Sequence, residues 1–384
     1  MLTQCEAIHP GFGFLSENAI FAQRCNQEKL TFIGPKPKHI AAMGDKAKAR
    51  SMMSSLGVPT LVGSDGIVSD DARAQALANE MGYPVLLKAS AGGGGKGMRL
   101  VERPQDLPRL FREAQLEAQS SFNDNQIYLE RFIRGARHIE FQMLGDHYGE
   151  VVCLGERECS LQRRNQKLIE EAPANNFSDD TRRQAALTFV RALRSMGYVS
   201  AGTIECLMDS DNKLYFMEMN TRLQVEHPVT EMITGIDIVE WQVRIACNER
   251  IDFSGDQVRL NGAAIECRIN AEHVGDDFRP CPGVVNKVVW PNHEQEGIRI
   301  DTYLEDGTTI PAFYDSMVAK VIVHAEDRQA ALAMMERALS QISIDGVSTT
   351  IDFHRSILRN KDFREGYYDC SFIEKNMKEL LAQG

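Results

Sequence analysis

Residues 85–101 read VLLKASAGGGGKGMRLV, with an apolar run on each side of a glycine-rich segment. Short apolar runs bounded by glycine are typical of buried strands, so Val85–Ala89 and Met98–Val101 are predicted to form two strands joined by the glycines. A dinucleotide-binding fold or a P-loop requires a helix directly after the glycines, so both are excluded here. What remains is a glycine hairpin whose backbone N–H groups can surround an anion.

The same segment can also be an exposed hairpin tip that binds nothing. Ordering four consecutive glycines costs considerable chain entropy. That cost favours a loop that closes on a ligand, with Lys88 and Lys96 on either side of it.

The rest of the chain alternates between helical and extended patterns. Helices are predicted at Lys46–Leu56, Asp70–Met81, Asp106–Ala118, Ser178–Met196, Arg328–Gln341, Thr349–Leu358 and Phe372–Leu381. Strands are predicted at Gln126–Phe132, His138–Leu144, Val151–Glu156, Ala201–Met208, Leu214–Glu226 and Ala263–Ala271. Helices between such antiparallel strands give an α+β fold.

The first residues begin inside an alternating β/α pattern. Glu6–Leu15 reads as a strand end followed by a Gly/Pro turn. A helix is predicted next, with Ser16 as its N-cap and its end near Cys25, and Leu30–Ile33 is a short strand.

The composition excludes several functional classes. The chain has 384 residues with 43 Lys and Arg against 54 Asp and Glu, a formal net charge of −11. Nucleic acids and anionic membranes repel such a chain, so neither is expected as a partner. No apolar run reaches the roughly 18 residues of a membrane span and no signal-peptide pattern opens the chain, which predicts a cytoplasmic protein. The nine cysteines form no C-x-x-C pair, as expected for free thiols in a reducing compartment.

Two acidic residues and an amide are predicted to share one face of a hairpin. The turn 209–212 joins the strands that carry Glu205 and Glu218, and a tight hairpin pairs position 205 with about position 216. Glu205 and Glu218 then lie diagonally on one face, with Asn220 two residues further along. Carboxylate and amide oxygens suit Mg²⁺, which also holds phosphates. The alternative is a solvated acidic face.

Residues 217–226 read MEMNTRLQVE, in which polar and apolar side chains alternate. In an extended chain one face then presents Glu218, Asn220, Arg222, Gln224 and Glu226. An ordinary half-exposed strand also alternates, but it more often presents Thr and Lys. In this series the fork of Arg222 can fix a planar anion and Glu226 can act as a base.

Two basic elements complete the set of candidate residues. A predicted loop from Glu156 to Glu171, which can also be a solvated surface loop, contains Arg157, Arg163, Arg164 and Lys167. Arg268 shares a strand face with Glu266, so a strand-surface ion pair is the alternative to a functional arginine.

Together these stretches resemble the biotin carboxylase family of ATP-grasp enzymes. The matching residues run along the whole chain: 7–18, 44–46, Lys88 with 92–97, 162–173, 218–227 and 266–272. The resemblance implies an ATP-grasp fold with a glycine-loop lid, preceded by a truncated Rossmann-like N-terminal domain. The implied boundaries are residues 1–59 for the N-terminal remnant and linker, 60–132 for the lid subdomain, and 133–384 for the ATP-grasp base and C-terminal domain.

The resemblance implies an ATP-dependent ligase that carboxylates biotin on a biotin carboxyl carrier protein. Bicarbonate is the carbon source, carboxyphosphate is the intermediate, and ATP is required with Mg²⁺ or Mn²⁺. This is the first half-reaction of acetyl-CoA carboxylase, in fatty acid biosynthesis, or of a related carboxylase. The carrier and the carboxyltransferase are expected in trans, because the segment around Lys378 lacks the flanks of a biotinylated lysine. Full-length members imply a homodimer.

Residue roles carried over by position follow from the same resemblance. The nucleotide would be bound by Lys46, Lys88, Gly94, Gly95, Glu130, Arg131, Phe132, Ile133, His138 and Asn165. Bicarbonate would be bound by Lys167, Arg222, Gln224 and Val225, and the metal by Glu205, Glu218 and Asn220. The catalytic set would be Lys167, Arg222, Glu226 as the base for bicarbonate, and Arg268, which would bind biotin and stabilise its enolate.

Three features depart from the family pattern. Asn165 stands where the family usually has His, and Phe12 where Tyr is common. Met1 corresponds to a position well inside the family's first domain, so we expect an open sheet edge and uncovered apolar side chains near Ile8, Phe12 and Phe14. Two alternative functions are a fragment with a structural or assembly role, catalytically impaired because its first domain is incomplete, and another ATP-grasp carbon–nitrogen ligase that acts on a different acceptor.

Overall fold

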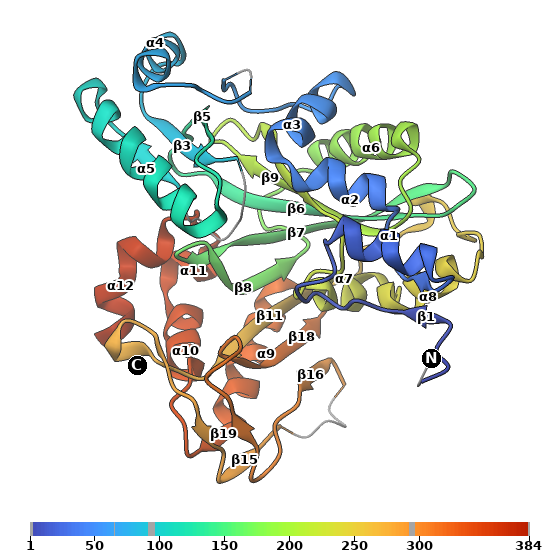
Figure 1. Ribbon diagram of the computed structural model, residues 1–384. Coiled ribbons are helices and arrows are strands. Elements are labelled where there is room, and N and C mark those ends of the chain that lie inside the picture. Colours follow the sequence, from blue (N-terminus) through green and yellow to red (C-terminus); the bar gives the residue numbers. More distant parts are fainter. Residues whose placement is uncertain (1–2, 65, 91–96, 292–295, 383–384) are drawn as a thin grey trace.

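The computed structural model describes residues 3–64, 66–90, 97–291 and 296–382. Its largest sheet consists of β6 (Arg137–Gly145), β7 (Val151–Arg163), β8 (Gln166–Ala172), β9 (Ser200–Met208), β10 (Leu214–Asn220), β11 (Ala263–Asn270), β16 (Ile298–Thr302) and β18 (Met317–Ala325). The strand order is β10-β9-β6-β7-β8-β11-β18-β16, and every neighbouring pair is antiparallel. The predicted α+β class is confirmed (Figure 1).

The remaining elements surround this sheet. The helices are α1 (Ala19–Gln27), α2 (Pro37–Gly44), α3 (Lys46–Ser55), α4 (Asp71–Met81), α5 (Leu107–Phe122), α6 (Asp179–Met196), α7 (His227–Thr234), α8 (Ile238–Ala246), α9 (Arg328–Gln341), α10 (Ile351–Arg359), α11 (Lys361–Glu365) and α12 (Phe372–Ala382). The shorter strands are β1 (Ala7–Ile8), β2 (Thr31–Phe32), β3 (Val85–Ala89), β4 (Arg99–Val101), β5 (Ile127–Arg131), β12 (Glu272–His273), β13 (Arg279–Pro280), β14 (Gly283–Val284), β15 (Lys287–Val289), β17 (Thr309–Ile310) and β19 (Ser343–Asp345).

The two faces of the large sheet differ in chemistry. One face is covered by α6, which packs on β6 and β7, and by α9, which packs on β11 and β18. Odd-numbered residues such as Phe141 and Ile265 contribute to the apolar cores on that side. Because side chains alternate along a strand, Glu140 and Glu266 lie on the opposite face, where α7 packs across β7, β8, β11 and β18. The sheet therefore separates an apolar core from a polar face.

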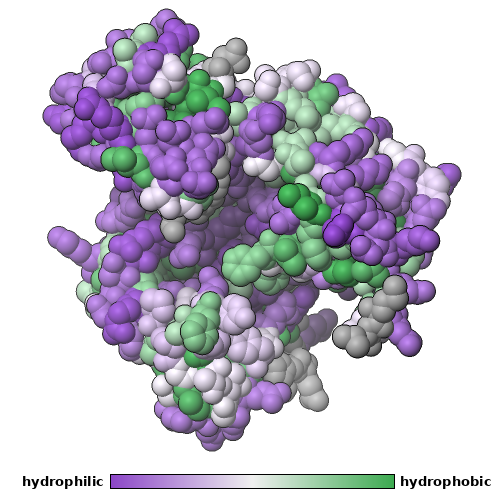
Figure 2. All heavy atoms as spheres, in the orientation of Figure 1, coloured by the Kyte–Doolittle hydropathy of each residue, from purple (hydrophilic) through white to green (hydrophobic). Residues whose placement is uncertain are grey.

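A smaller unit lies above one end of the large sheet. Strands β4, β3 and β5 form a three-stranded sheet whose apolar core includes side chains of α4 and α5. The predicted hairpin is confirmed, since Val85 pairs with Val101 and Leu87 with Arg99. The predicted anion-binding loop, including Gly94 and Gly95, lies outside the described residues. Figure 2 shows that the molecule is hollowed beneath this unit and that hydrophilic residues line the hollow.

The N-terminal segment is a βαβ unit, in which β1 and β2 pair in parallel. The predicted N-cap Ser16 is wrong: Asn18 caps α1 by accepting the backbone N–H of Phe21 at 2.8 Å, whereas the Ser16 hydroxyl donates to the Gly13 carbonyl. Phe14 is 97% exposed, as expected.

Two segments that carry candidate residues fold differently from the prediction. The loop predicted from Glu156 to Glu171 is in fact the β7–β8 hairpin, and charged residues such as Arg157 and Lys167, which point into the polar face, hide its strand pattern. Arg164 and Asn165 form its two-residue turn with φ of 49° and 63°, conformations that Asn tolerates well.

The extended run predicted through Glu226 is also wrong beyond Asn220. β10 ends there, and α7 starts at His227 with Glu226 as its N-cap residue and Pro228 in its first turn. The register differs as well, since an irregularity between Phe216 and Glu218 sets Glu218 directly opposite Glu205. The two carboxylates are therefore cross-strand neighbours, not diagonal ones.

The C-terminal helices predicted at Arg328–Gln341, Thr349–Leu358 and Phe372–Leu381 are confirmed as α9, α10 and α12. Among the described residues, no helix is both long enough and apolar enough to cross a membrane.

The packing of α6 against the sheet predicts a large effect of one aromatic residue. Phe189 is 2% exposed and its ring lies 5.0 Å from that of Phe141. Phe189→Ala should lower the free energy of unfolding by about 3–5 kcal/mol, because it leaves a cavity in the core. Leu187→Ala, on the same helix but 53% exposed, should change it by less than about 0.5 kcal/mol. Urea unfolding of both variants measures this, and equal effects would contradict the packing.

Candidate active site

A buried ammonium group lies at the centre of the polar face. Lys167 on β8 places its Nζ 2.6 Å from Glu140, 3.1 Å from Glu205 and 2.5 Å from Glu226. Burial alone would lower the pKa of Lys167, but the three carboxylates raise it well above its ordinary value. The lysine is therefore a fixed positive charge that joins β6, β9 and the start of α7.

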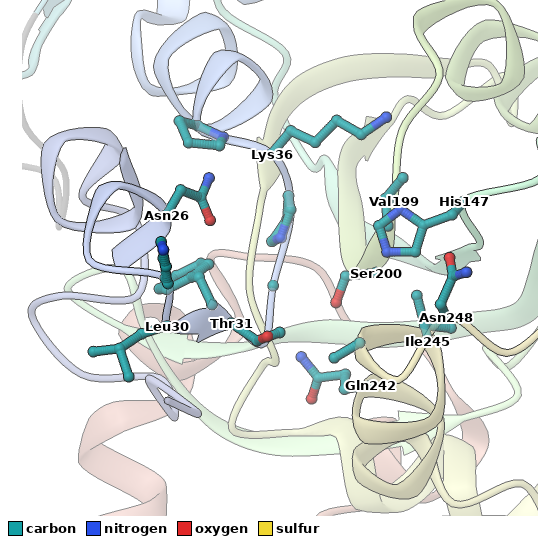
Figure 3. Close-up of a pocket in the computed structure, with 16 residues that line it drawn as sticks. Asn26, Leu30, Thr31, Lys36, His147, Val199, Ser200, Gln242, Ile245 and Asn248 are labelled. Atoms are coloured by element: carbon teal, nitrogen blue, oxygen red, sulfur yellow. The ribbon is translucent and has the colours of Figure 1, made fainter. Parts of the chain in front are cut away.

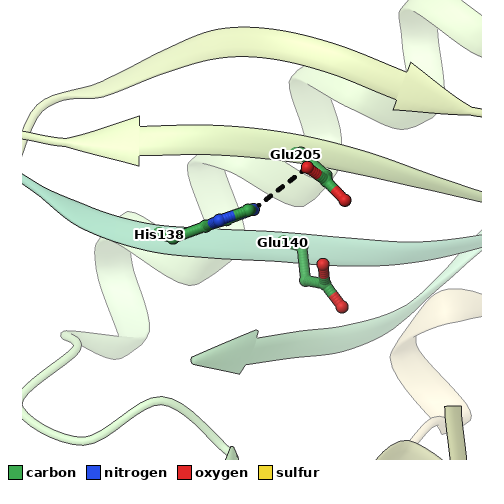
Figure 4. Close-up of side chains that lie close together, drawn as sticks. All are labelled: His138, Glu140 and Glu205. Carbon is green, nitrogen blue, oxygen red and sulfur yellow. Dashed lines mark ion pairs between the residues drawn. The ribbon is translucent and has the colours of Figure 1, made fainter. Parts of the chain in front are cut away.

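Glu205 is the most highly coordinated of these carboxylates. Its Oε1 accepts hydrogen bonds from Lys167, from Asn220 at 2.9 Å and from Gln224 at 2.9 Å, while its Oε2 lies 3.1 Å from His138 Nε2. Figure 4 shows His138 directed at Glu205 from the neighbouring strand. Burial would raise the pKa of Glu205, but Lys167 and His138 hold it below the ordinary value. The carboxyl group is thus ionised.

Arg157 fixes several side chains of the site through hydrogen bonds. It is fully buried and donates to Glu140 at 2.5 Å, to Gln142 at 2.8 Å, to Thr230 at 2.9 Å and to Thr203 at 3.2 Å. These bonds fix Glu140 for its contact with the central ammonium. The guanidinium is part of the sheet's interior, contrary to its predicted place in a loop.

The sequence-based prediction missed Glu140. A signal was present, because polar His138, Glu140 and Gln142 alternate with apolar Ile139 and Phe141 along β6. That alternation marks a strand with one polar face, and only its burial distinguishes it from an exposed strand.

Glu226 and Arg268 form the other side of the site. Glu226 Oε2 lies 2.9 Å from the Arg268 guanidinium, which also contacts Glu170 at 2.6 Å. Burial would raise the pKa of Glu226, but Lys167, Arg268 and Arg157 hold it well below its ordinary value, so the group is ionised. The alternative pairing of Arg268 with Glu266 is wrong, since its partners are Glu170 and Glu226.

Arg222 connects the site to the N-terminal segment. Its guanidinium lies 3.0 Å from Glu17, 2.9 Å from the Gln224 side-chain oxygen and 3.1 Å from the Asn220 side-chain oxygen. The backbone N–H of Thr221 also donates to Glu17 at 2.9 Å. Glu17 lies in the stretch 7–18 that resembles the family, but no local pattern pairs it with Arg222, which is 205 residues away.

Two further lysines lie where the small unit meets the large sheet. Lys46, at the start of α3, pairs with Glu218 at 2.9 Å, and Lys88 on β3 pairs with Glu130 at 2.6 Å. Burial would lower the pKa of Lys46, but Glu218 raises it above its ordinary value. Each of these lysines is thus held in place by a carboxylate.

The other predicted residues lie at the margin of this cluster. Arg131, Phe132 and Ile133 are at the end of β5 and just after it, and Asn165 is at the exposed tip of the β7–β8 hairpin. The Val225 carbonyl accepts from Lys320 at 2.8 Å.

Two arginines predicted in the basic set bind elsewhere. Arg164 pairs with Asp277 at 2.7 Å, and Arg163 contacts the same carboxylate. They connect the β7–β8 hairpin to the C-terminal part of the chain.

Glu205, Glu218 and Asn220 are the candidate ligands for Mg²⁺. Glu205 and Glu218 face each other across β9 and β10, while the Asn220 amide donates to Glu205 and its oxygen accepts from Arg222. Carboxylate and amide oxygens are the ligands this ion prefers. The nitrogen and carboxylate ligand atoms of His138, Glu140 and Glu205 also lie within 4.8 Å of one another, but an imidazole suits Mg²⁺ less well.

A separate cavity of about 450 Å³ lies between the N-terminal segment and α8. Its lining includes Lys29, Lys36 and His147. Figure 3 shows Lys36 and His147 with Ser200 and Gln242. It contains none of the predicted site residues.

An antiparallel sheet with carboxylates and cations on its polar face, beneath a small unit with a glycine hairpin, defines an ATP-grasp enzyme. Three family models match the chain: "Biotin carboxylase, N-terminal domain" at residues 1–40, "Carbamoyl-phosphate synthase L chain, ATP binding domain" at 45–253, and "Biotin carboxylase C-terminal domain" at 266–375. The chain belongs to the biotin carboxylase family of ATP-dependent ligases.

Individual relatives agree with this assignment. The chain is 50% identical to a biotin carboxylase of Nostoc sp., over 97% of this chain and 83% of that protein. It is 46% identical to the chloroplastic biotin carboxylase of Arabidopsis thaliana, over 98% and 70%. The biotin carboxylase domain of Hydrogenobacter thermophilus 2-oxoglutarate carboxylase, solved with MgADP, ADP and bicarbonate, superposes with a TM-score of 0.96 at 47% identity, over 99% of this chain and 83% of that one.

The central lysine predicts a pH-dependent loss of stability. Lys167→Met leaves three buried carboxylates without their shared ammonium, which should cost about 3–5 kcal/mol near pH 8. In the wild type, Lys167 helps to hold the pKa values of Glu205 and Glu226 below the ordinary value. Without the ammonium, burial is less opposed and raises these pKa values, so in the variant the carboxyl groups take up protons as pH falls and the cost of their buried charge is removed. The deficit of the variant should therefore shrink toward pH 4.

Urea unfolding at both pH values tests this, with Lys213→Met as a control because that side chain is 66% exposed. A deficit of the same size at pH 4 and pH 8 would show that Lys167 does not act through the carboxylates.

Proposed function

We propose that this chain carboxylates biotin on a biotin carboxyl carrier protein, using ATP and bicarbonate. The observation that carries the proposal is the placement of ionised Glu226 between Lys167 and Arg268, while Gln224 donates to Glu205, another partner of Lys167, and is itself bonded to Arg222. This arrangement combines a binding site for the bicarbonate anion, a base, and a cation for biotin, the acceptor. Bicarbonate-dependent ATP hydrolysis with free biotin tests it directly.

In the first step, Lys167, Arg222, Gln224 and the Val225 backbone would bind bicarbonate. Glu226 takes the bicarbonate proton as the bicarbonate oxygen attacks the γ-phosphorus, and the bond to ADP breaks. The products are carboxyphosphate and ADP. When bound, Mg²⁺ or Mn²⁺ on Glu205, Glu218 and Asn220 would neutralise phosphate charge.

In the second step, carboxyphosphate decomposes to CO₂ and phosphate. The phosphate takes the N1 proton of biotin, and N1 attacks CO₂. Arg268 would bind the ureido oxygen and stabilise the negative charge that develops there, as a guanidinium already held in place by Glu170 and Glu226 can.

The nucleotide would lie in the hollow beneath the small unit. Lys46 and Lys88 are the proposed phosphate ligands, and the backbone of Gly94 and Gly95 would cover the phosphates. The adenine and ribose would contact Glu130, Arg131, Phe132, Ile133, His138 and Asn165.

We propose the domain division 1–59, 60–132 and 133–384, a carrier and a carboxyltransferase in trans, a homodimer, and a cytoplasmic location. Relatives include a 2-oxoglutarate carboxylase small subunit at 48% identity and a methylcrotonoyl-CoA carboxylase subunit alpha at 47% identity. Identity at this level does not select the final acceptor, because that choice belongs to the carboxyltransferase.

Glu226→Gln should keep ATP binding and lose bicarbonate-stimulated turnover at least about 100-fold, because an amide cannot take the bicarbonate proton. Glu240→Gln, on an exposed position of α8, is the matched control. Single-turnover ATP cleavage and nucleotide calorimetry measure the two properties. Turnover close to wild type in Glu226→Gln would exclude Glu226 as the base.

Arg268→Ala should reduce biotin carboxylation more than bicarbonate-dependent ATP cleavage, because Arg268 acts on the acceptor. The comparison uses both assays on one preparation, with exposed Arg279→Ala as control. Equal losses in the two assays would remove the role in enolate stabilisation.

A further inference from the structure

Two carboxyl groups beside Arg268 have no part in the steps above. Glu170 on β8 and Glu266 on β11 are directly opposite each other in the sheet, and both are fully buried. Directly opposite residues have Cβ atoms about 4.5–5.5 Å apart, so their carboxyl groups can meet. They lie on the polar face, next to the proposed biotin site.

Their hydrogen bonds are incomplete. Glu170 Oε1 accepts from Arg268 at 2.6 Å, but among the described residues Glu170 Oε2 and both oxygens of Glu266 have no partner. A buried ionised carboxylate without a donor is very costly. If Glu266 keeps its proton, its O–H can donate to Glu170 Oε2, and one shared proton satisfies both groups.

The charged groups around Glu266 do not offer another solution. On β18, Lys320 bonds to the Val225 carbonyl at 2.8 Å and lies 3.2 Å from Asp301. At the start of α7, Glu226 is negative and His227 is neutral, since burial lowers the His227 pKa to about 3.

The direction of titration agrees with this geometry. Burial raises the pKa of Glu266 well above its ordinary value, and the opposing effects of Lys320 and Arg268 do not reverse that. Burial also raises the pKa of Glu170, to about 7, against the effect of Arg268.

We propose that Glu266 is a positioning residue that retains a proton and donates it in a hydrogen bond to Glu170, so that a single negative charge orients Arg268 toward Glu226 and biotin. The inference rests on the proposed function, because it gives Arg268 its role. A second charge at this point would draw the guanidinium into the sheet and away from the substrate.

The first experiment measures kcat/KM for biotin in three variants. Glu266→Gln imitates the neutral acid and should stay within about twofold of wild type, whereas Glu266→Ala leaves Glu170 Oε2 unpaired and should lose about tenfold. Glu170→Gln removes the charge that orients Arg268 and should also lose at least about tenfold. Bicarbonate-dependent ATP cleavage without biotin should change less in each. A loss in Glu266→Gln as large as in Glu170→Gln would overturn the proposal.

The second experiment needs no activity and compares unfolding of wild type and Glu266→Gln from pH 5 to pH 8. The unfolded glutamate ionises near 4.5, while the folded one keeps its proton. Stability from this group is thus present below the unfolded pKa and is lost as pH rises, by up to about tenfold in the unfolding equilibrium constant per pH unit. As pH rises, the stability of Glu266→Gln should therefore increase relative to that of wild type, whereas the relative stability of exposed Glu326→Gln should not change.

If the difference in stability between Glu266→Gln and wild type does not vary with pH, Glu266 is ionised in the folded chain and the inference is overturned. A wild-type chain without bicarbonate-dependent ATP cleavage would instead refute the proposed function, and the stability comparison would still report on the proton.

Discussion

The contact of one buried ammonium with three carboxylates is the constraint around which the rest of the polar face is arranged. Lys167 reaches Glu140, Glu205 and Glu226, which come from β6, β9 and the residue before α7. Removing charges from water is expensive, and only close, well-oriented partners recover that cost. The long β7–β8 hairpin serves this purpose, because it holds Lys167 and its support Arg157 over neighbouring strands.

The sheet makes such a cluster possible because its two faces pack against different surroundings. Odd-numbered residues of β6 and β11 supply apolar area to cores beneath α6 and α9, and even-numbered ones are free to be charged. A strand that is buried between two apolar layers has a continuous apolar sequence. Here one of the two buried faces is polar, so polar and apolar residues still alternate along each strand. The same strands thus bury charged side chains on one face and apolar side chains on the other.

The sequence predicted the elements that depend on local or apolar signals. The helix 328–341 and the strand 85–89 were predicted with their final bounds, and the carboxylate pair Glu205 and Glu218 was assigned to one face. The β7–β8 hairpin was missed because Arg157 resembles a surface residue, and the partners that bury it lie 15 to 73 residues away in the chain. The strand predicted at Leu214–Glu226 continues too far, because Pro228, just after it, belongs to the first turn of a helix, where proline is well suited.

The cations proposed to meet substrates share one property, which is that each already has a carboxylate partner. Lys46 pairs with Glu218, Lys88 with Glu130, Arg222 with Glu17 and Arg268 with Glu170. Such a partner fixes a long side chain before the substrate arrives, so less rotamer entropy is lost on binding. An ammonium offers three donors and a guanidinium five. An anionic substrate can therefore add to these four pairs without displacing their carboxylates, whereas at Lys167, whose three donors already face Glu140, Glu205 and Glu226, it must take the place of one of them.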